Sequence, residues 1–157
     1  MPDDLYARDA LAWSERQAEL LRRVARGERV NDVDWDHVVE EIEDVGLSQL
    51  NAVHSYLRQM LAHLLKQHGW PEADARDHWR NEVATFQVDA IARYAPSMRQ
   101  RIDLARVYEL AQRQIAPMRR GDRLGLPAPA SCPVTLDQLL IDQVEDLEAA
   151  FSVRTAG

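Results

Sequence analysis

The stretch that decides the fold runs from Val38 to Lys66 and reads VVEEIEDVGLSQLNAVHSYLRQMLAHLLK. Its apolar residues recur at three- and four-residue steps, which places them on one face of an α-helix. Gly46 falls on the same face, and a glycine inside a helix costs about 1 kcal/mol relative to alanine. We therefore predict one long amphipathic helix that is kinked or closely approached at Gly46. The residues expected to share its buried face are Val39, Ile42, Val53, Leu57, Met60, Leu61 and Leu64.

Helix-terminating residues divide the rest of the chain into four more helical segments. Each carries a stripe of apolar residues with helical spacing. Gly27 ends the first helix, and Gly69 to Pro71 end the long one. Ala95 to Ser97 separate the third helix, about 72–94, from the fourth, because the residue before a proline avoids the helical conformation.

The last helix follows an irregular connection of about 117–134 that is rich in proline and glycine. Thr135 and Gln138 have the spacing of a capping box, in which each side chain satisfies the other's backbone N–H. Leu136, Leu140, Val144, Leu147 and Phe151 then form the apolar stripe of a short helix.

No segment of useful length alternates between apolar and polar residues, so no sheet is expected. The predicted fold class is all-α, a helical bundle of four main helices plus a shorter C-terminal fifth helix. At 157 residues the chain is long enough for one well-packed core. We expect a single domain over residues 1–157.

The charge distribution argues against binding of nucleic acid. The formal net charge is −7, which disfavours nonspecific binding to polyanions. Eight arginines nevertheless lie between Arg93 and Arg123, against Asp103, Glu109 and Asp122. We expect the stripe of Arg99, Arg106 and Arg113 to meet the acidic segments within one molecule or between subunits.

The sequence also predicts a soluble, cytoplasmic protein. No run approaches the ~18 apolar residues of a membrane span, and the N-terminus is acidic, so neither a membrane anchor nor a signal peptide is expected. The single cysteine, Cys132, excludes an internal disulfide and is simplest to reconcile with a reducing compartment.

Residues spread over most of the chain are similar to a known pattern. In the first half they include Asp9, Trp13-Ser14, Gln17-Ala18, Asp34-Trp35 and the run Glu40 to Asp44 with Gly46. In the second half they include His63 to Lys66, Trp79-Arg80, Pro96-Ser97 and Cys132 to Leu136.

Together these residues resemble a bacterial family known as domain of unknown function twenty-nine. The resemblance implies a helical bundle and supplies no activity. The chain departs from the pattern in one place, because His68-Gly69-Trp70 stands where a tryptophan directly after Lys66 is expected.

The acids at the start of the long helix and two histidines further on suggest either a metal site or a solvated helix face. Di-iron and related sites in bundles combine carboxylates with histidines from facing helices. The candidate ligands here are Glu40, Glu43 and His63, and any further donors would be Glu15, Glu19 or His78. Acids are also favoured at a helix N-terminus by its dipole. Residue spacing alone does not decide between the two.

No complete catalytic set is recognisable. The serines lack the sequence context of a nucleophile elbow, Cys132 has no adjacent base, and there is no glycine-rich phosphate loop or cysteine-based zinc pattern. Two classes of function remain. The first is a helical interaction or regulatory module without catalysis, acting through a protein partner or as a homo-oligomer and needing no cofactor. The alternative is a metal-dependent, hydrolase-like enzyme with a carboxylate and histidine site around Glu40, Glu43 and His63.

Overall fold

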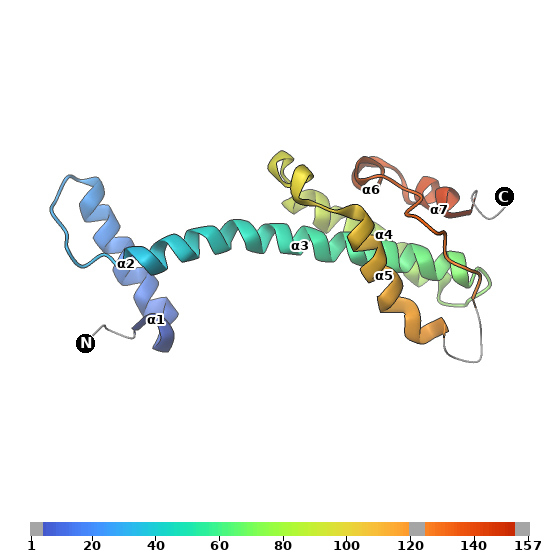
Figure 1. Cartoon of the computed structure of the whole chain (residues 1–157), viewed down its shortest axis with the longest axis horizontal. Helices are drawn as coiled ribbons and strands as arrows, with labels where there is room; N and C mark the ends of the chain where they lie inside the picture. Colours follow the sequence, from blue (N-terminus) through green and yellow to red (C-terminus); the bar gives the residue numbers. More distant parts are fainter. Residues whose placement is uncertain (1–4, 120–124, 153–157) are drawn as a thin grey trace. The chain divides into compact units, whose positions relative to one another are not determined.

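The computed structural model describes residues 5–119 and 125–152, and every regular element within these two ranges is a helix (Figure 1). The all-α prediction is confirmed. No helix in the described ranges is long and apolar enough to cross a membrane. The elements are α1 (Leu5–Arg8), α2 (Ala10–Ala25), α3 (Trp35–Gly69), α4 (Arg76–Arg93), the 3-10 helix η1 (Pro96–Arg101), α5 (Leu104–Arg119), α6 (Leu136–Ile141) and α7 (Val144–Ser152).

The chain divides into two compact units, Met1–Ser48 and Gln49–Gly157. The boundary falls inside α3, which contributes its first residues to one unit and the remainder to the other. The single domain expected over residues 1–157 therefore stays a prediction.

In the first unit, α2 begins and ends where the sequence signals predict. The Asp9 carboxylate accepts a hydrogen bond from the backbone N–H of Ala12 at 3.0 Å and caps the helix. Gly27 has a φ of 84°, the left-handed conformation that glycine adopts without strain. Trp13 and Leu20 of α2 are buried with the same unit's Val33 and Val38.

The face of α3 expected to be buried is exposed in this unit. Val39 is 51% exposed and Ile42 is 68% exposed. The prediction was wrong here because α2 packs near Val38, and adjacent residues of a helix point about 100° apart. Gly46 was predicted to mark either a kink or a close approach by another helix, and a Cβ added there would meet nothing within 4 Å, so the close approach is not seen in the described residues.

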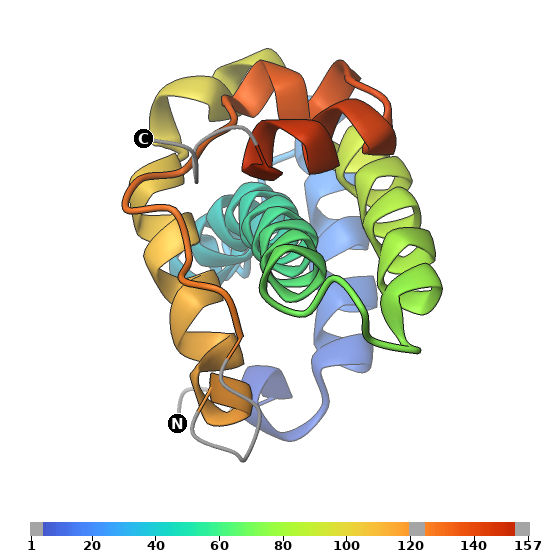
Figure 2. The ribbon, with the colours of Figure 1, turned by 90° about the vertical axis from the view of Figure 1, so that its right-hand side faces the viewer.

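In the second unit, the remainder of α3 runs between the other helices (Figure 2). The predicted stripe is buried here, with exposures of 1% or less at Val53, Leu57, Met60, Leu61 and Leu64. Helices α4, α5, α6 and α7 each add residues to the same hydrophobic cluster. This central helix positions most of the side chains discussed below.

The segment after Ala95 differs from the expected fourth helix. Residues Pro96–Arg101 form the 3-10 helix η1, and α5 begins only at Leu104. The Asp103 carboxylate accepts from the backbone N–H of Arg106 at 3.2 Å, as a capping residue does. The apolar stripe of α5 is buried as predicted at Val107, Tyr108, Ala111 and Ile115.

The predicted C-terminal helix is divided into α6 and α7. Its capping box is confirmed, because the Thr135 hydroxyl accepts from Gln138 N–H at 3.2 Å and the Gln138 side chain accepts from Thr135 N–H at 2.8 Å. Asp142 is extended, with a ψ of 153°, and ends α6. The Gln87 amide of α4 donates to the carbonyl of Leu139 at 2.8 Å and to that of Asp142 at 2.9 Å. In a continuing helix, backbone N–H groups would donate to these carbonyl oxygens; at this break the Gln87 side chain donates to them instead.

The connection predicted from about residue 117 begins later, since α5 continues to Arg119 with Pro117 inside it. Residues 120–124 of this connection lie outside the described ranges. From Gly125 onward it is not helical and is held by side chains of the second unit. The Tyr108 hydroxyl donates to the carbonyl of Pro129 at 2.6 Å, and His68 Nε2 lies 3.0 Å from the carbonyl of Pro127.

Candidate functional site

The acids nominated by the sequence lie on the first unit's part of α3. Glu40 and Glu43 are exposed. Their neighbour Glu41 accepts a hydrogen bond from the Tyr6 hydroxyl at 2.7 Å. This bond, reinforced by burial and nearby carboxylates, raises the pKa of Tyr6 to about 12. Glu41 therefore joins α1 to α3, while the two candidate ligands face solvent.

His63 lies in the second unit and is only 8% exposed. Its ring meets the ring of Phe86 edge-on, with centroids 5.8 Å apart, and its Nδ1 is buried without a hydrogen-bond partner. Burial, followed by the charge of Lys66, lowers the pKa of His63 to about 4. The histidine is therefore neutral near pH 7 and packs as part of the α3–α4 contact.

The candidate metal ligands are divided between the two units. Glu40 and Glu43 belong to the first unit and His63 to the second. Glu15 and Glu19 lie exposed on α2. In the described ranges, no group of three or more histidine, cysteine, aspartate or glutamate side chains is arranged to hold a metal ion.

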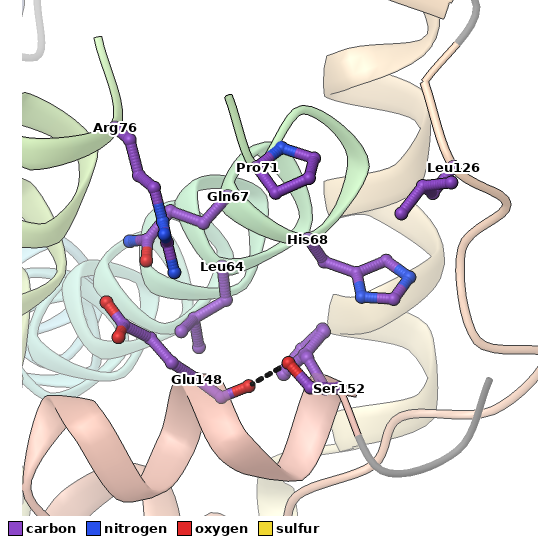
Figure 3. Close-up of a pocket in the computed structure, with 9 residues that line it drawn as sticks. Leu64, Gln67, His68, Pro71, Arg76, Leu126, Glu148 and Ser152 are labelled. Carbon is purple, nitrogen blue, oxygen red and sulfur yellow. Dashed lines mark hydrogen bonds between the residues drawn. The ribbon is translucent and has the colours of Figure 1, made fainter. Parts of the chain in front are cut away.

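A cavity of about 190 Å³ lies in the second unit, where the end of α3 meets α7. Figure 3 shows Gln67 and Glu148 converging on it, with Arg76 and His68 at its sides. Phe151 also lines it.

The Glu148 carboxylate at this cavity is bonded to Arg80 of α4 and to Gln67 of α3. Arg80 Nε donates to Glu148 Oε1 at 2.7 Å, and Arg80 Nη2 donates to Glu148 Oε2 at 2.5 Å. Gln67, with its amide nitrogen toward α7, donates to Glu148 Oε1 at 2.5 Å and accepts from the backbone N–H of Arg80 at 3.2 Å. The carboxylate holds the pKa of Arg80 above its usual value. This cluster joins α3, α4 and α7.

Cys132 lines a wider cavity of about 650 Å³ beside α5. Its Sγ donates to the carbonyl of Val134 at 3.3 Å. Burial raises the pKa of the thiol. Because the thiolate is the nucleophilic form, this cysteine is a packed side chain rather than a reactive one.

An apolar surface remains on the first unit's part of α3. Three large side chains are each more than half exposed: Trp35 at 53%, Val39 at 51% and Ile42 at 68%. With Gly46 they follow one another at steps of four, three and four residues, which places them on one side of the helix. We name this surface the bare face. Val45, 66% exposed, borders it.

The sequence model for domain of unknown function DUF29 matches residues 5–144. The chain belongs to the DUF29 family. None of the curated proteins matches it in sequence. Among solved structures, it is similar to the crystal structure of an alpha-helical protein of unknown function from Rhodospirillum rubrum. The two are 28% identical, with a TM-score of 0.64, and the match covers 95% of this chain and 96% of the other.

Three of the residues that carry the DUF29 resemblance in the first unit, Trp13, Gln17 and Asp34, form a hydrogen-bonded cluster. Trp13 Nε1 donates to Asp34 Oδ2 at 3.0 Å, and the backbone N–H of Asp34 donates to Gln17 Oε1 at 2.8 Å. His37 Nδ1 lies 2.7 Å from the same carboxylate, and its ring stacks on Tyr6 at 3.9 Å. The His37 contact holds the pKa of Asp34 below its usual value and that of His37 above it. Together with His37 and Tyr6, these residues connect α1, α2 and α3.

Two features of this DUF29 chain were missed in the sequence. One sequence signal could have indicated the cluster of Gln67, Arg80 and Glu148. Gln67 lies three residues after Leu64 on the buried stripe, and a polar residue at a buried position needs a hydrogen-bond partner. The bare face also had a signal, because four acids crowd the same turns of α3 and indicate solvent rather than core.

Proposed function

We propose that this DUF29 protein is a helical interaction module without catalysis, which binds a basic amphipathic helix of a partner protein along the bare face of α3. The observation that carries the proposal is the exposure of Trp35, Val39 and Ile42, each above 50%. Aromatic and branched apolar residues at steps of three and four are the anchors used when a helix binds a helix. Large exposed apolar groups gathered on one surface are typical of interaction sites.

Charge supports a basic partner. The unit Met1–Ser48 holds thirteen aspartates and glutamates against six arginines, a formal charge of −7, whereas Gln49–Gly157 holds thirteen acidic and thirteen basic residues. All of the chain's net charge therefore belongs to the unit that carries the bare face. Glu40, Glu43 and Asp44 are exposed on the turns that carry it. Complementary charges increase the rate of encounter and select the partner.

The spacing of the apolar residues on α3 is evidence that the partner is helical. From Val53 onward these residues are buried by the helices of the second unit, so their spacing already suits helix packing. A Cβ added at Gly46 would meet nothing within 4 Å, and this leaves room for another backbone to come close. A second copy of the chain is the less suitable occupant, because two acidic units would face each other with like charge. A cytoplasmic, bacterial setting accords with the proposal.

Peptide binding tests the proposal directly. The probes are two fluorescein-labelled helical peptides of equal length and apolar content, one of leucine and lysine and the other of leucine and glutamate. Fluorescence anisotropy should show saturable binding of the basic peptide only. The variant Val39→Ser/Ile42→Ser should weaken that binding at least about tenfold, which corresponds to ~1.4 kcal/mol.

The matched control is Leu11→Ser/Val88→Ser, which removes two apolar side chains that are 70% and 65% exposed outside the bare face. It should bind the basic peptide as the native chain does. Equal loss in both variants would show general surface adhesion and would contradict the proposal. So would concentration-dependent dimerisation in sedimentation equilibrium that only Val39→Ser/Ile42→Ser abolishes, since the occupant would then be a second copy.

A further inference from the structure

A cavity of about 260 Å³ lies in the second unit, between α3, the end of η1 and the start of α5. Its walls combine positive charge, neutral polar groups and an apolar patch. Arg58 comes from α3, Arg101 ends η1, and Arg106 lies in the first turn of α5. The other lining residues are Asn51, His54, Ser55, Asp103, Val107 and Leu110.

In the part of the chain that the structure describes, two of the three arginines that line this cavity, Arg58 and Arg101, lack the carboxylate partners that other arginines have. Arg58 Nε is buried and makes no hydrogen bond. Within the described residues, neither Arg58 nor Arg101 forms an ion pair. By contrast, Arg80 is bonded to Glu148 and Arg99 to Asp137. A buried donor without a partner is costly in a folded protein, and no acceptor in the described residues offsets that cost for Arg58 Nε.

The one acidic side chain in the lining, Asp103, offsets part of this charge. The Asp103 carboxylate is engaged by the backbone N–H of Arg106 at 3.2 Å. Arg106 keeps one contact outside the cavity, from Nη1 to Glu109 Oε2 at 2.8 Å. Three arginines thus line one space with a single carboxylate among the lining residues, and two of the three form no ion pair in the described ranges.

We propose that this cavity binds a small organic phosphate monoester. Guanidinium groups match phosphate oxygens with paired N–H donors, and a monoester carries up to two negative charges at neutral pH. Asn51, His54 and Ser55 supply further polar contacts from α3. Val107 is buried near the N-terminal end of α5. Together with Leu110 it forms an apolar wall that the organic part of the ligand can contact. The site lies in the unit that does not carry the bare face, so it is independent of the interaction proposed above.

Isothermal titration calorimetry of the full chain tests this assignment. The probes are phenyl phosphate and inorganic phosphate, each added in a phosphate-free buffer at constant ionic strength. Phenyl phosphate should bind, and more tightly than inorganic phosphate, because its ring can contact Val107 and Leu110. Each of the variants Arg58→Gln and Arg101→Gln should weaken binding at least about tenfold.

The matched control is Arg22→Gln, which removes the same charge from an exposed position of α2 in the first unit. It should bind phenyl phosphate with unchanged affinity. If Arg58→Gln fails to fold by circular dichroism, Arg101→Gln decides the test, because Arg101 is exposed.

Three results would overturn the assignment. The first is no heat of binding from millimolar phenyl phosphate. The second is equal weakening in Arg22→Gln, which would mean general charge attraction. The third is binding to phosphatidylcholine vesicles that contain phosphatidic acid, lost in Arg58→Gln, without binding of phenyl phosphate; the phosphate recognised would then belong to a lipid surface.

Discussion

Arg80 and Glu148 form a two-point ion pair between α4 and α7, with N–O distances of 2.7 and 2.5 Å across 68 positions of sequence. The Glu148 side chain is 12% exposed and that of Arg80 is 39% exposed. Gln67 of α3 bonds to the same carboxylate. One acid therefore connects three helices of the second unit.

Replacing Glu148 by alanine is expected to destabilise the protein by about 2 kcal/mol, since Arg80 and Gln67 would lose their acceptor in a half-buried place. Urea denaturation at pH 7 measures the change. The control Glu145→Ala removes an exposed acid from the same helix and should shift stability by less than about 0.5 kcal/mol. Equal effects in the two variants would contradict a special role for the pair.

Thr135→Ala is expected to cost about 1 kcal/mol, the usual effect of losing a capping hydroxyl. The hydroxyl accepts from the backbone N–H of Gln138, and alanine leaves that donor unpaired. Thr85→Ala is the matched control, because the Thr85 hydroxyl donates to the Asn81 carbonyl inside α4, a bond whose loss costs little in a helix interior. Thermal unfolding of both variants should show a lowered midpoint for Thr135→Ala alone.

Local sequence signals predicted most helix boundaries, whereas the break between α6 and α7 was missed. The effects of Gly27, Gly69 and Thr135 on helix ends depend only on residues a few positions away, so these boundaries can be predicted from the sequence. The break at Asp142 has no proline or glycine near it. It depends on the Gln87 amide, 52 and 55 positions from the carbonyls that it bonds. A tertiary contact of this kind leaves no local pattern.

Periodicity predicted the apolar face of α3 and could not predict what covers it. The stripe containing Val39 and Val53 is continuous in sequence, yet Val39 is 51% exposed and Val53 is fully buried. Burial depends on which neighbouring helices pack there, and α2 packs near Val38 instead. The cavity at Arg58 and Arg101 was missed for the same reason, since the two residues are 43 positions apart and meet only through the packing of α3 and η1.

Replacing both Glu40 and Glu43 by glutamine is expected to change stability by less than about 0.5 kcal/mol, the range for surface substitutions. Both side chains are exposed. Treatment of untagged protein with a chelator should leave its melting temperature unchanged, because a bound ion would stabilise the native state by mass action. A melting temperature that falls with chelator in the native chain, and no longer does so in His63→Ala, would restore the metal-enzyme alternative.

Duplex DNA is not expected to bind at physiological salt. Arg99 is paired with Asp137, and both Arg106 and Arg113 contact Glu109 at 2.8 and 2.9 Å, so the arginine stripe is largely neutralised within the second unit. A gel-shift assay at micromolar protein should show free DNA only. Retardation that disappears steeply as salt is raised would contradict this, since it would report release of counterions from the phosphate backbone.

Acid is expected to destabilise the protein through His63. The folded pKa is about 4 and the unfolded value is near 6.5, so between these values the unfolded chain binds a proton that the folded chain does not. The contribution of neutral His63 to the free energy of unfolding is therefore fully present above pH 6.5, and it is lost as the pH falls toward 4. The groups around the ring include Lys66 and His78, whose charges lower the pKa, and Glu82, whose charge opposes them.

Integrating this difference gives a loss of about 2 kcal/mol between pH 7 and pH 5. Urea denaturation at the two pH values measures it. His63→Leu keeps an apolar side chain against Phe86 and should abolish this part of the pH dependence, leaving only the contribution of the carboxyl groups. His54→Leu, a change at a partly exposed histidine of the same helix, should retain the full dependence. If the native chain and His63→Leu lose the same free energy on acidification, His63 is not the group responsible.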